Sequence, residues 1–370
     1  MPTLDWIGKQ AVVNHHRKVP LRLLECDRAL SAGDPDSGNL LIEGDNLEAL
    51  KALLPYYKGQ VKCIYIDPPY NTGNEGWVYN DNVNDPRIRK WLREVVGKET
   101  EDLCRHDKWL CMMYPRLMLL REFLRDDGAI FVSLDDNEIQ NLRAIMDEVF
   151  GRRNFVATVI WQKVYAPKNS ARHFSEDHDY IVVYAKNADR WIPNPIRRTE
   201  AQDAAYKNPD NDPRGPWRVD GLSARNPYSR GLYAVTTPSG RVIPGPPKGR
   251  YWSVSEERFK ELDADGRIWW GKDGNNNPGL KRFRSEVKEG RVPQTFWSYK
   301  EVGHTQDAKK ELIAVCDFPD SASVFITPKP TKLLQRILEI ATDKDSIIMD
   351  SFAGSGTTGH AVMAQNALDG

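Results

Sequence analysis

The sequence has 370 residues, 40% of them apolar and 28% charged, which is typical of a globular chain with one large domain and an insertion, or with two domains. No N-terminal signal segment and no window of about 18 apolar residues is present, so we expect neither secretion nor a membrane span. The five scattered cysteines favour a reducing, cytoplasmic location and argue against a disulfide framework or a metal site.

The formal net charge of zero hides an uneven distribution. Residues 151–300 contain 27 Lys and Arg against 17 Asp and Glu, together with seven of the eleven tryptophans. The flanking segments carry 25 against 35. A basic, aromatic-rich insertion between acidic flanks is typical of a polyanion-binding module on an enzyme core. A solvated surface over a few core aromatics would have the same composition.

Apolar runs and helical spacing alternate through the first half of the chain, which favours a mostly parallel sheet with helices on both faces. A polar stretch at 71–101 is too long for an ordinary connection, so it is either functional or disordered. The spacing predicts a helix at 46–57 capped by Asn46, one at 108–128 that Pro115 kinks and Gly128 ends, and one at 137–151. Strands are predicted at 39–45, 61–67, 129–136, 154–163 and 179–186.

The alternation breaks from Asn187 to about Ser323, where Pro, Gly, Arg, Asn and Trp gather in turn clusters. We interpret this stretch as an inserted domain of short strands and loops. The α/β order then returns, with a predicted helix at 329–342 followed by a strand, a Gly-rich turn and a helix at 345–368.

Two motifs follow predicted strands. "DPPY", Asp67 to Tyr70, stands at the carboxyl end of a buried strand, where open α/β sheets bind ligands. A rigid Pro-Pro exit, with Asp67 bonding backbone N–H groups, is the structural alternative. "FAGSG", Phe352 to Gly356, links a strand to a helix, and its glycines let the backbone approach a ligand closely. It matches neither a dinucleotide fingerprint nor a P-loop.

The order D-P-P-Y, basic insertion, F-x-G-x-G resembles the circularly permuted β class of DNA adenine-N6 methyltransferases. Within that class, "IYIDPPYNTGNEGWVYNDN", "GAIFVSLDDNE" and "TPKPTKLL" resemble the modification (Mod) subunits of type III restriction–modification systems. The resemblance implies an α/β fold with a permuted Rossmann-like methyltransferase sheet and an inserted DNA-recognition domain. It also implies S-adenosyl-L-methionine as cofactor, double-stranded DNA as substrate, and a helicase–nuclease restriction subunit or a second copy of the chain as partners.

The resemblance gives the D-P-P-Y residues catalytic roles. The Asp67 carboxylate and the Pro68 carbonyl would accept the two N–H bonds of adenine N6 and localise its lone pair for attack on the methyl group. Pro68 and Pro69 fix φ, so these acceptors are held before the substrate arrives. The target base must be flipped out of the duplex, and the face of Tyr70 would stack on it.

The resemblance also assigns the cofactor site and the recognition site. Phe352, Gly354, Gly356 and Thr357 would line the cofactor, Asp350 would lie near its α-amino group, and Lys329 would reach its carboxylate. Asp45 would approach the adenine ring, although a charge at a helix N-terminus explains Asp45 equally well. Within the insertion, the candidates for DNA contact are Lys281, Arg282, Arg284 and residues 275–277.

The expected organisation is an N-terminal extension at 1–38, a catalytic half at 39–186, a target-recognition insertion at 187–323 and a cofactor-binding half at 324–370. The family continues with a strand whose terminal acidic residue holds the cofactor ribose, whereas this sequence ends at Gly370. We therefore expect a truncated core with two exposed strand edges, unless an apolar segment such as 18–26 replaces that strand.

Three alternatives to adenine-N6 methylation remain open from the sequence. The first is cytosine N4 as the acceptor, although that group often has S-P-P-Y in place of D-P-P-Y. The second is another amine, in an RNA base or a protein glutamine. The third is a DNA-recognition module without turnover, caused by the shortened core.

Overall fold

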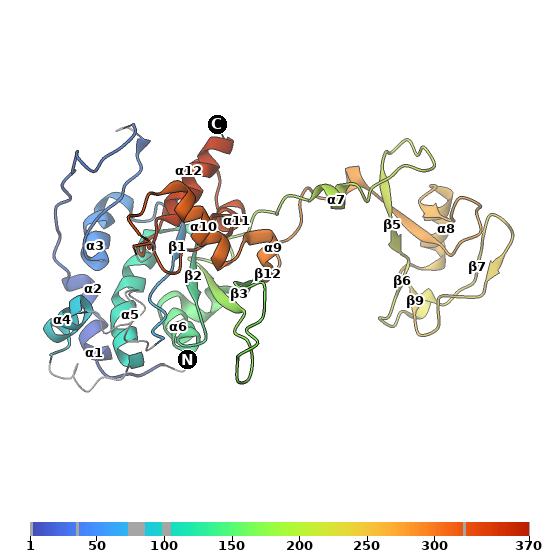
Figure 1. The fold of residues 1–370 in the computed structure, drawn as a ribbon. Helices are drawn as coiled ribbons and strands as arrows, with labels where there is room; N and C mark the ends of the chain where they lie inside the picture. The colour runs from blue at the N-terminus through green and yellow to red at the C-terminus, as the bar shows by residue number, and fades with distance from the viewer. Residues whose placement is uncertain (1–2, 35–36, 73–85, 98–104, 321–322, 370) are drawn as a thin grey trace. The chain divides into compact units, whose positions relative to one another are not determined.

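The computed structural model describes residues 3–34, 37–72, 86–97, 105–320 and 323–369 (Figure 1). The chain divides into two compact units. Unit 1 comprises Met1–Asn194 and Val292–Gly370, and unit 2 comprises Pro195–Arg291. None of the described helices is long and apolar enough to cross a membrane.

Unit 1 is built on a six-stranded sheet with the order β12-β3-β4-β2-β1-β13. Strands β13, β1 and β2 run parallel, as expected, and β12 is parallel to β3. The expectation of a mostly parallel sheet is wrong at β4, which is antiparallel to both β2 and β3 because a loop without a helix joins β3 to β4. The strands are β1 (Val61–Ile66), β2 (Leu124–Leu134), β3 (Phe155–Gln162), β4 (His178–Ala185), β12 (Phe296–Trp297) and β13 (Ile347–Met349).

Helices cover both faces of this sheet. Helices α3, α5 and α6 pack together on one face, and α11 and α12 pack together on the other (Figure 1). The chain thus forms the α/β class predicted from the alternation. The helices are α1 (Lys9–Val12), α2 (His15–Lys18), α3 (Asn46–Tyr57), α4 (Pro86–Val95), α5 (Arg105–Phe123), α6 (Ile139–Met146), the π-helix η3 (Asp147–Gly151), the 3₁₀ turn η4 (Arg152–Asn154), α9 (Tyr299–Val302), α10 (Thr305–Val315), α11 (Thr331–Ala341) and α12 (Thr357–Asp369).

The strand predicted at 39–45 does not form. Leu40 and Leu41 are 64% and 90% exposed, and no strand of the described chain pairs with them. The short strand β13 is the sheet edge on its side. A strand gains its stability from a paired neighbour, so an apolar run without one stays irregular. The segment 18–26 does not replace a strand either, since Leu23 is 94% exposed.

Two helix boundaries differ from their predictions. Asp45, and not Asn46, caps α3, because its carboxylate accepts hydrogen bonds from the backbone N–H groups of Leu47 and Glu48. Helix α5 ends at Phe123, and Gly128 lies inside β2. The polar stretch at 71–101 lies partly outside the described residues, and α4 occupies part of the remainder.

The N-terminal segment packs into the same core as the sheet. Trp6, Val12 and Val19 belong to the buried cluster that α3, α5, β1 and β2 share. The Trp6 and Tyr114 rings lie 5.6 Å apart, and Lys9 Nζ lies 2.8 Å from a Glu148 carboxylate oxygen. Part of the expected extension is therefore integral to unit 1.

Unit 2 has its own apolar core around Leu222, Trp252 and Phe259. Its range, 195–291, is narrower than the insertion expected at 187–323, because β12 pairs with β3 and α10 follows it within unit 1. The elements of unit 2 are α7 (Glu200–Asp203), β5 (Trp217–Gly221), β6 (Ser223–Ala224), the 3₁₀ turn η5 (Ser229–Gly231), β7 (Val235–Thr236), β8 (Val242–Ile243), β9 (Tyr251–Trp252), α8 (Glu256–Ala264), β10 (Ile268–Trp269), β11 (Gly279–Phe283) and the 3₁₀ turn η6 (Arg284–Glu286).

Gly128 provides a test of packing between β1 and β2. A Cβ atom there would lie 2.9 Å from the Val61 carbonyl oxygen and 3.0 Å from that of Lys62. Gly128→Ala should therefore lower the free energy of unfolding by about 1–3 kcal/mol, measured by urea denaturation. Gly359→Ala is the matched control, because nothing lies within 4 Å of its Cβ position on α12, and it should stabilise by up to about 1 kcal/mol. Equal stabilities for the two variants would contradict this account.

Candidate active site

The two sequence motifs meet because their strands are neighbours. Strand β1 pairs in parallel with β13, with Ile64 opposite Met349. The turn that begins at Asp67 and the turn that begins at Asp350 therefore leave the same edge of the sheet. Parallel strands in an open α/β sheet bind ligands at this edge.

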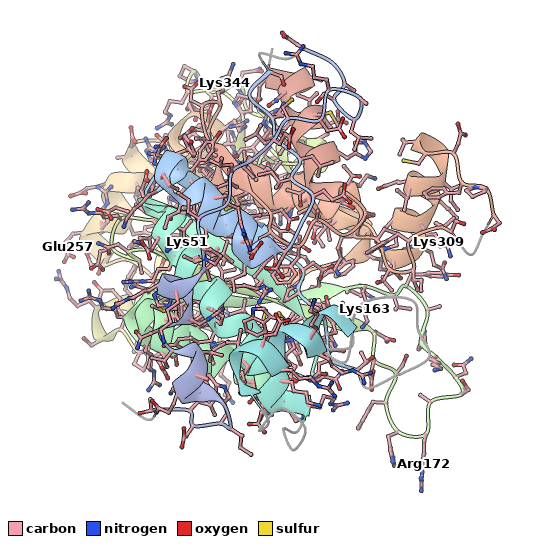
Figure 2. The ribbon with its side chains drawn as sticks, turned by 90° about the vertical axis from the view of Figure 1, so that its left-hand side faces the viewer. Lys51, Lys163, Arg172, Glu257, Lys309 and Lys344 are labelled. Carbon is pink, nitrogen blue, oxygen red and sulfur yellow. The ribbon has the colours of Figure 1, made fainter. Side chains whose placement is uncertain are left out.

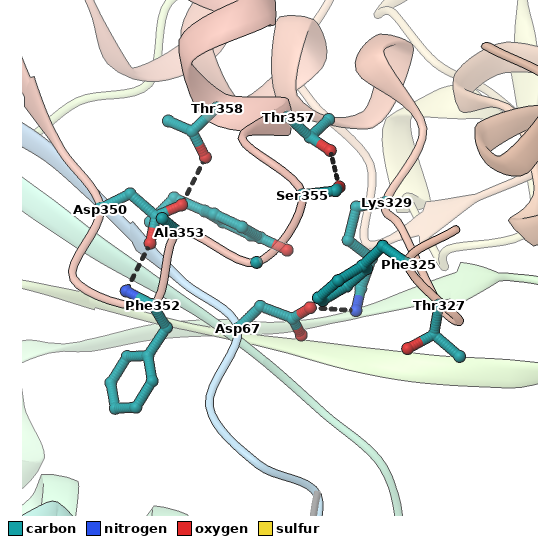
Figure 3. A pocket seen from close by; sticks show the side chains of 12 residues that line it. Asp67, Phe325, Thr327, Lys329, Asp350, Phe352, Ala353, Ser355, Thr357 and Thr358 are labelled. Carbon is teal, nitrogen blue, oxygen red and sulfur yellow. Dashed lines mark hydrogen bonds and ion pairs between the residues drawn. The ribbon is translucent and has the colours of Figure 1, made fainter. Parts of the chain in front are cut away.

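A pocket lies between the two turns (Figure 3). Six of the eleven predicted catalytic and cofactor residues line it, whereas five lie outside the lining set: Asp45, Pro68, Pro69, Tyr70 and Gly356. The sequence analysis did not assign Phe325 and Thr327, which lie just before Lys329, to the site. The mixture of apolar and polar residues in "FITP" is the signal that could have indicated them. The lining residues are Tyr65, Asp67, Phe325, Thr327, Lys329, Asp350, Phe352, Ala353, Gly354, Ser355, Thr357 and Thr358.

Two of the lining residues, Asp67 and Lys329, form an ion pair. Lys329 Nζ lies 2.5 Å from Asp67 Oδ2, and the two side chains are only 9% and 12% exposed (Figure 3). The second oxygen, Asp67 Oδ1, is buried and has no hydrogen-bond partner among the described residues. Burial raises the pKa of Asp67 although the Lys329 ammonium group opposes this shift. Such a carboxylate has one oxygen fixed and one ready to accept a hydrogen bond.

Tyr70 is held beside this pair. Its hydroxyl donates to Asp179 Oδ2 at 3.3 Å, and Asp179 in turn binds Lys163 Nζ at 2.6 Å. The Lys329 ammonium lies 5.0 Å from the centre of the Tyr70 ring, within the range of a cation–π contact. Burial raises the pKa of Tyr70 well above its usual value, so the phenol stays a hydrogen-bond donor.

The chain after Asp67 is fixed by contacts from helix α5 and from Glu138, the residue before α6. The Trp109 indole N–H donates to the Pro69 carbonyl at 2.7 Å. Asn71 is buried with a left-handed φ of 58°, and its side-chain amide donates to the buried Glu138 carboxylate. Glu138 also bonds His106 Nδ1 at 2.7 Å. This network, which the sequence did not indicate, makes the D-P-P-Y turn rigid.

The Gly-rich turn is organised around Asp350. Its carboxylate accepts hydrogen bonds from the Phe352 backbone N–H at 2.9 Å and from the Thr358 hydroxyl at 2.5 Å. Gly354 and Gly356 have φ values of 53° and 79°, which favour glycine. A Cβ at Gly354 would lie 3.4 Å from the Phe325 ring. The turn therefore keeps its backbone close to the pocket.

Asp45 is placed at the start of α3, outside the pocket. Besides capping the helix, its Oδ2 lies 3.4 Å from Arg116 Nη2. The neighbouring Asn46 carries a link that the sequence did not reveal, since its side chain donates to the Ser351 carbonyl at 2.9 Å. The helix-charge explanation of Asp45 is therefore the one that its contacts support.

The DNA-contact candidates of β11 and η6 differ in their surroundings. Lys281 is buried, and its ammonium group binds the carboxylates of Asp210 and, at 3.0 Å, Asp212. The prediction that Lys281 faces DNA is therefore wrong, because alternate residues of this strand point inward. Arg282 is exposed and pairs with Asp220 at 3.1 Å, and Arg284 pairs with Asp203 at 3.0 Å.

Cys104, His106 and Cys111 are close in the sequence, but Cys104 lies outside the described residues, His106 bonds Glu138, and Cys111 is buried in the core. Within the part of the chain that the structure describes, no group of three or more His, Cys, Asp or Glu side chains is arranged to hold a metal ion.

Known DNA methylases and restriction–modification proteins are similar to this chain. The model of the DNA methylase family matches residues 61–367. The Mod subunit of the type III restriction–modification enzyme StyLTI from Salmonella typhimurium is 37% identical, over 99% of this chain and 56% of that protein. The type II methyltransferase M.KpnI from Klebsiella pneumoniae is 30% identical, over 92% of this chain and 80% of that protein. The solved complex of M1.HpyAVI with SAM is 14% identical and covers 87% of both chains at a TM-score of 0.35.

The sheet order and the two turns define an α/β core of the methyltransferase class. The chain belongs to the DNA methylase family, and its resemblance to type III Mod subunits is confirmed. It spans 56% of the length of the Salmonella relative.

Asp350 makes stability depend on pH. Burial raises its pKa from 3.8 to about 6. The unfolded chain therefore releases this proton at lower pH than the folded chain, and the stabilisation is complete below 3.8 and lost as pH rises through about 6. The unfolding free energy of the wild type minus that of Asp350→Asn should fall across this window in urea titrations. A difference that does not change with pH would contradict the burial of this carboxyl group.

Lys281 offers a second test, of stability in unit 2. Lys281→Met removes a cation from the buried Asp212, which keeps Arg214 as a partner, and from the more exposed Asp210. It should lower the free energy of unfolding by about 1–3 kcal/mol. Trp217 reports the transition by fluorescence, because Lys281 Nζ lies 5.3 Å from its ring. Arg282→Met is the matched control on the exposed face, with an expected loss of at most about 1 kcal/mol. Equal losses would show that the buried cluster does not stabilise the unit.

Proposed function

We propose that this chain is the catalytic part of a DNA adenine-N6 methyltransferase that uses S-adenosyl-L-methionine. The observation that carries the proposal is the unpartnered, buried Oδ1 of Asp67, next to the pocket of the Gly354 turn. A buried acceptor without a donor is rare in native proteins and marks a place where a ligand N–H fits. The exocyclic amine of adenine is such a donor.

The pocket residues fit the cofactor. The backbone of the Gly354 turn lets a ligand approach closely, Asp350 lies at the end of β13 for an ammonium group, and Lys329 is a cation within reach of a carboxylate. When bound, S-adenosyl-L-methionine supplies an electrophilic methyl group. Phe352, Gly356 and Thr357 complete this proposed site, while Asp45 is left out of it because it caps α3 and does not line the pocket.

The protein's own part is to hold the amine. Lys329 fixes Asp67 Oδ2, which leaves Oδ1 to accept one N–H of adenine N6. The Pro68 carbonyl would accept the other, and the rigid turn keeps both acceptors in place before the base arrives. Two acceptors on one amine localise its lone pair, and orientation of this kind can supply roughly 7–11 kcal/mol of the barrier. Tyr70, anchored through Asp179, would stack on the flipped base.

Unit 2 is the proposed target-recognition unit. It contains 19 Lys and Arg against 13 Asp and Glu. Arg282 and Arg284 are already paired. We therefore place DNA contact instead on four exposed residues that form no ion pair within the described residues: Arg225, Arg241, Lys248 and Lys272. Arg241 also bonds the Asn277 side chain at 3.2 Å, which presents a cation and an amide together, the pairing used to read base edges.

The partners and location follow from this reading. We propose double-stranded DNA as the substrate, a helicase–nuclease restriction subunit and a second copy of the chain as protein partners, and the cytoplasm as the compartment. Support comes from the similarity to type III Mod subunits.

The proposal is tested by transfer of tritiated methyl groups to unmethylated genomic DNA, followed by nucleoside analysis. Label should appear in N6-methyladenine. Asp67→Asn should lower the rate by about 10²–10³-fold, because an amide replaces the charged acceptor. Asp345→Asn, an exposed matched control, should leave the rate unchanged.

Four other outcomes of this experiment would each contradict a different part of the proposal. Label in N4-methylcytosine would reject adenine as the target. Label in RNA or protein added in parallel reactions, with none in DNA, would reject DNA as the substrate. An unlabelled product, with no binding of the cofactor in isothermal titration, would favour a recognition module without turnover. Normal transfer by Asp67→Asn would reject the proposed mechanism.

A further inference from the structure

The loop between β3 and β4, residues 163–177, leaves the sheet at the edge where the candidate site lies. Strand β4 begins at His178, and its antiparallel pairing places Tyr180 opposite Leu134 at the end of β2. Asp179, at the same end of β4, binds the Tyr70 hydroxyl. Figure 2 shows this loop projecting from unit 1, with Lys163 near its base and Arg172 at its outer end.

Hydrogen bonds within the loop give it a defined shape. The Lys163 N–H donates to the Asp177 carbonyl at 2.9 Å, the Lys168 N–H to the Ser175 hydroxyl at 2.7 Å, and the Ala171 N–H to the Lys168 carbonyl at 2.9 Å. The Ser175 hydroxyl donates to the Asp177 carboxylate. The ion pair of Lys163 with Asp179 ties the base of the loop to the residue that anchors Tyr70.

The outer part of this loop presents an aromatic ring among cations. Phe174 is 91% exposed, more than any other aromatic side chain of the described residues. Lys168, Arg172 and His173 are exposed beside it in the sequence, and neither Lys168 nor Arg172 has a carboxylate at ion-pair distance within the described chain. An exposed apolar ring flanked by unpaired cations suits a polyanion with an apolar interior.

We infer that the loop enters the DNA duplex at the target site, with Phe174 as a wedge that fills the stack where the adenine has left, and with Lys168 and Arg172 on the flanking phosphates. The inference rests on the proposed function and adds a positioning residue to it. Flipping a base opens a gap, and apolar side chains inserted between base steps hold such gaps open. A duplex is the partner that needs both parts of the loop, whereas a protein surface would not need the bias toward cations.

The test separates flipping from chemistry. The wild-type chain is first used to find its methylated sequence in genomic DNA. Duplexes with that sequence then carry 2-aminopurine at the target position, for fluorescence, or adenine opposite either thymine or an abasic site, for single-turnover methylation. Phe174→Ala should lose the fluorescence rise and lower methylation of the paired target by about 10-fold. Adenine opposite an abasic site needs no pair to be broken, so its rate should return to within about 2-fold of the wild type.

Two variants control for other effects. Ile192→Ala removes another exposed apolar side chain of unit 1, 79% exposed, and should change neither signal. Phe174→Trp keeps a ring and should retain both. Equal loss on paired and unpaired targets, or no loss on either, would overturn the wedge. Absence of methylation by the wild-type chain would instead reject the proposed function, so the two failures are distinguishable.

Discussion

The parallel pairing of β1 with β13 is the constraint on which the candidate site depends. It joins two segments from opposite ends of the chain, with Ile64 opposite Met349. Each strand ends in a turn with restricted backbone geometry, prolines after Asp67 and left-handed glycines after Asp350. Neither turn forms a pocket alone. The site is therefore a property of strand order, and any change that weakens this pairing removes the site without touching its side chains.

The electrostatics of the pocket follow from putting two carboxyl groups and one ammonium group at this edge. Lys329 is 2.5 Å from Asp67, and burial raises the pKa of both Asp67 and Asp350. Local hydrogen bonds to Asp350 and the cation beside Asp67 keep these groups in fixed positions. The burial of charge is tolerated because each carboxylate has a specific hydrogen-bond donor. The second oxygen of Asp67, Oδ1, has no donor among the described residues and can accept a hydrogen bond from a ligand.

Strand-end motifs could be predicted from the sequence because rigid residues after a buried strand are a local signal. The contact between the motifs also could, since neighbouring strands of a known sheet order bring their ends together. The absence of a strand at 39–45 could not be predicted, because strand formation depends on a paired neighbour and not on the apolar run itself. Lys281 looked like a surface cation, and only its position on the inward face of β11 shows that Asp210 and Asp212 neutralise it. The Asn71–Glu138 network left no pattern at all, since its members come from separate elements.

The way unit 2 joins unit 1 has an evolutionary consequence. The chain enters and leaves unit 2 side by side, because Ile196 and Arg291 exchange backbone hydrogen bonds of 2.9 and 2.8 Å. A different unit with the same bridge between its first and last residues could be connected to unit 1 at the same two points of the chain. Recombination within this segment can therefore exchange one such unit for another in a single step, while Asp67 and its surroundings are inherited unchanged.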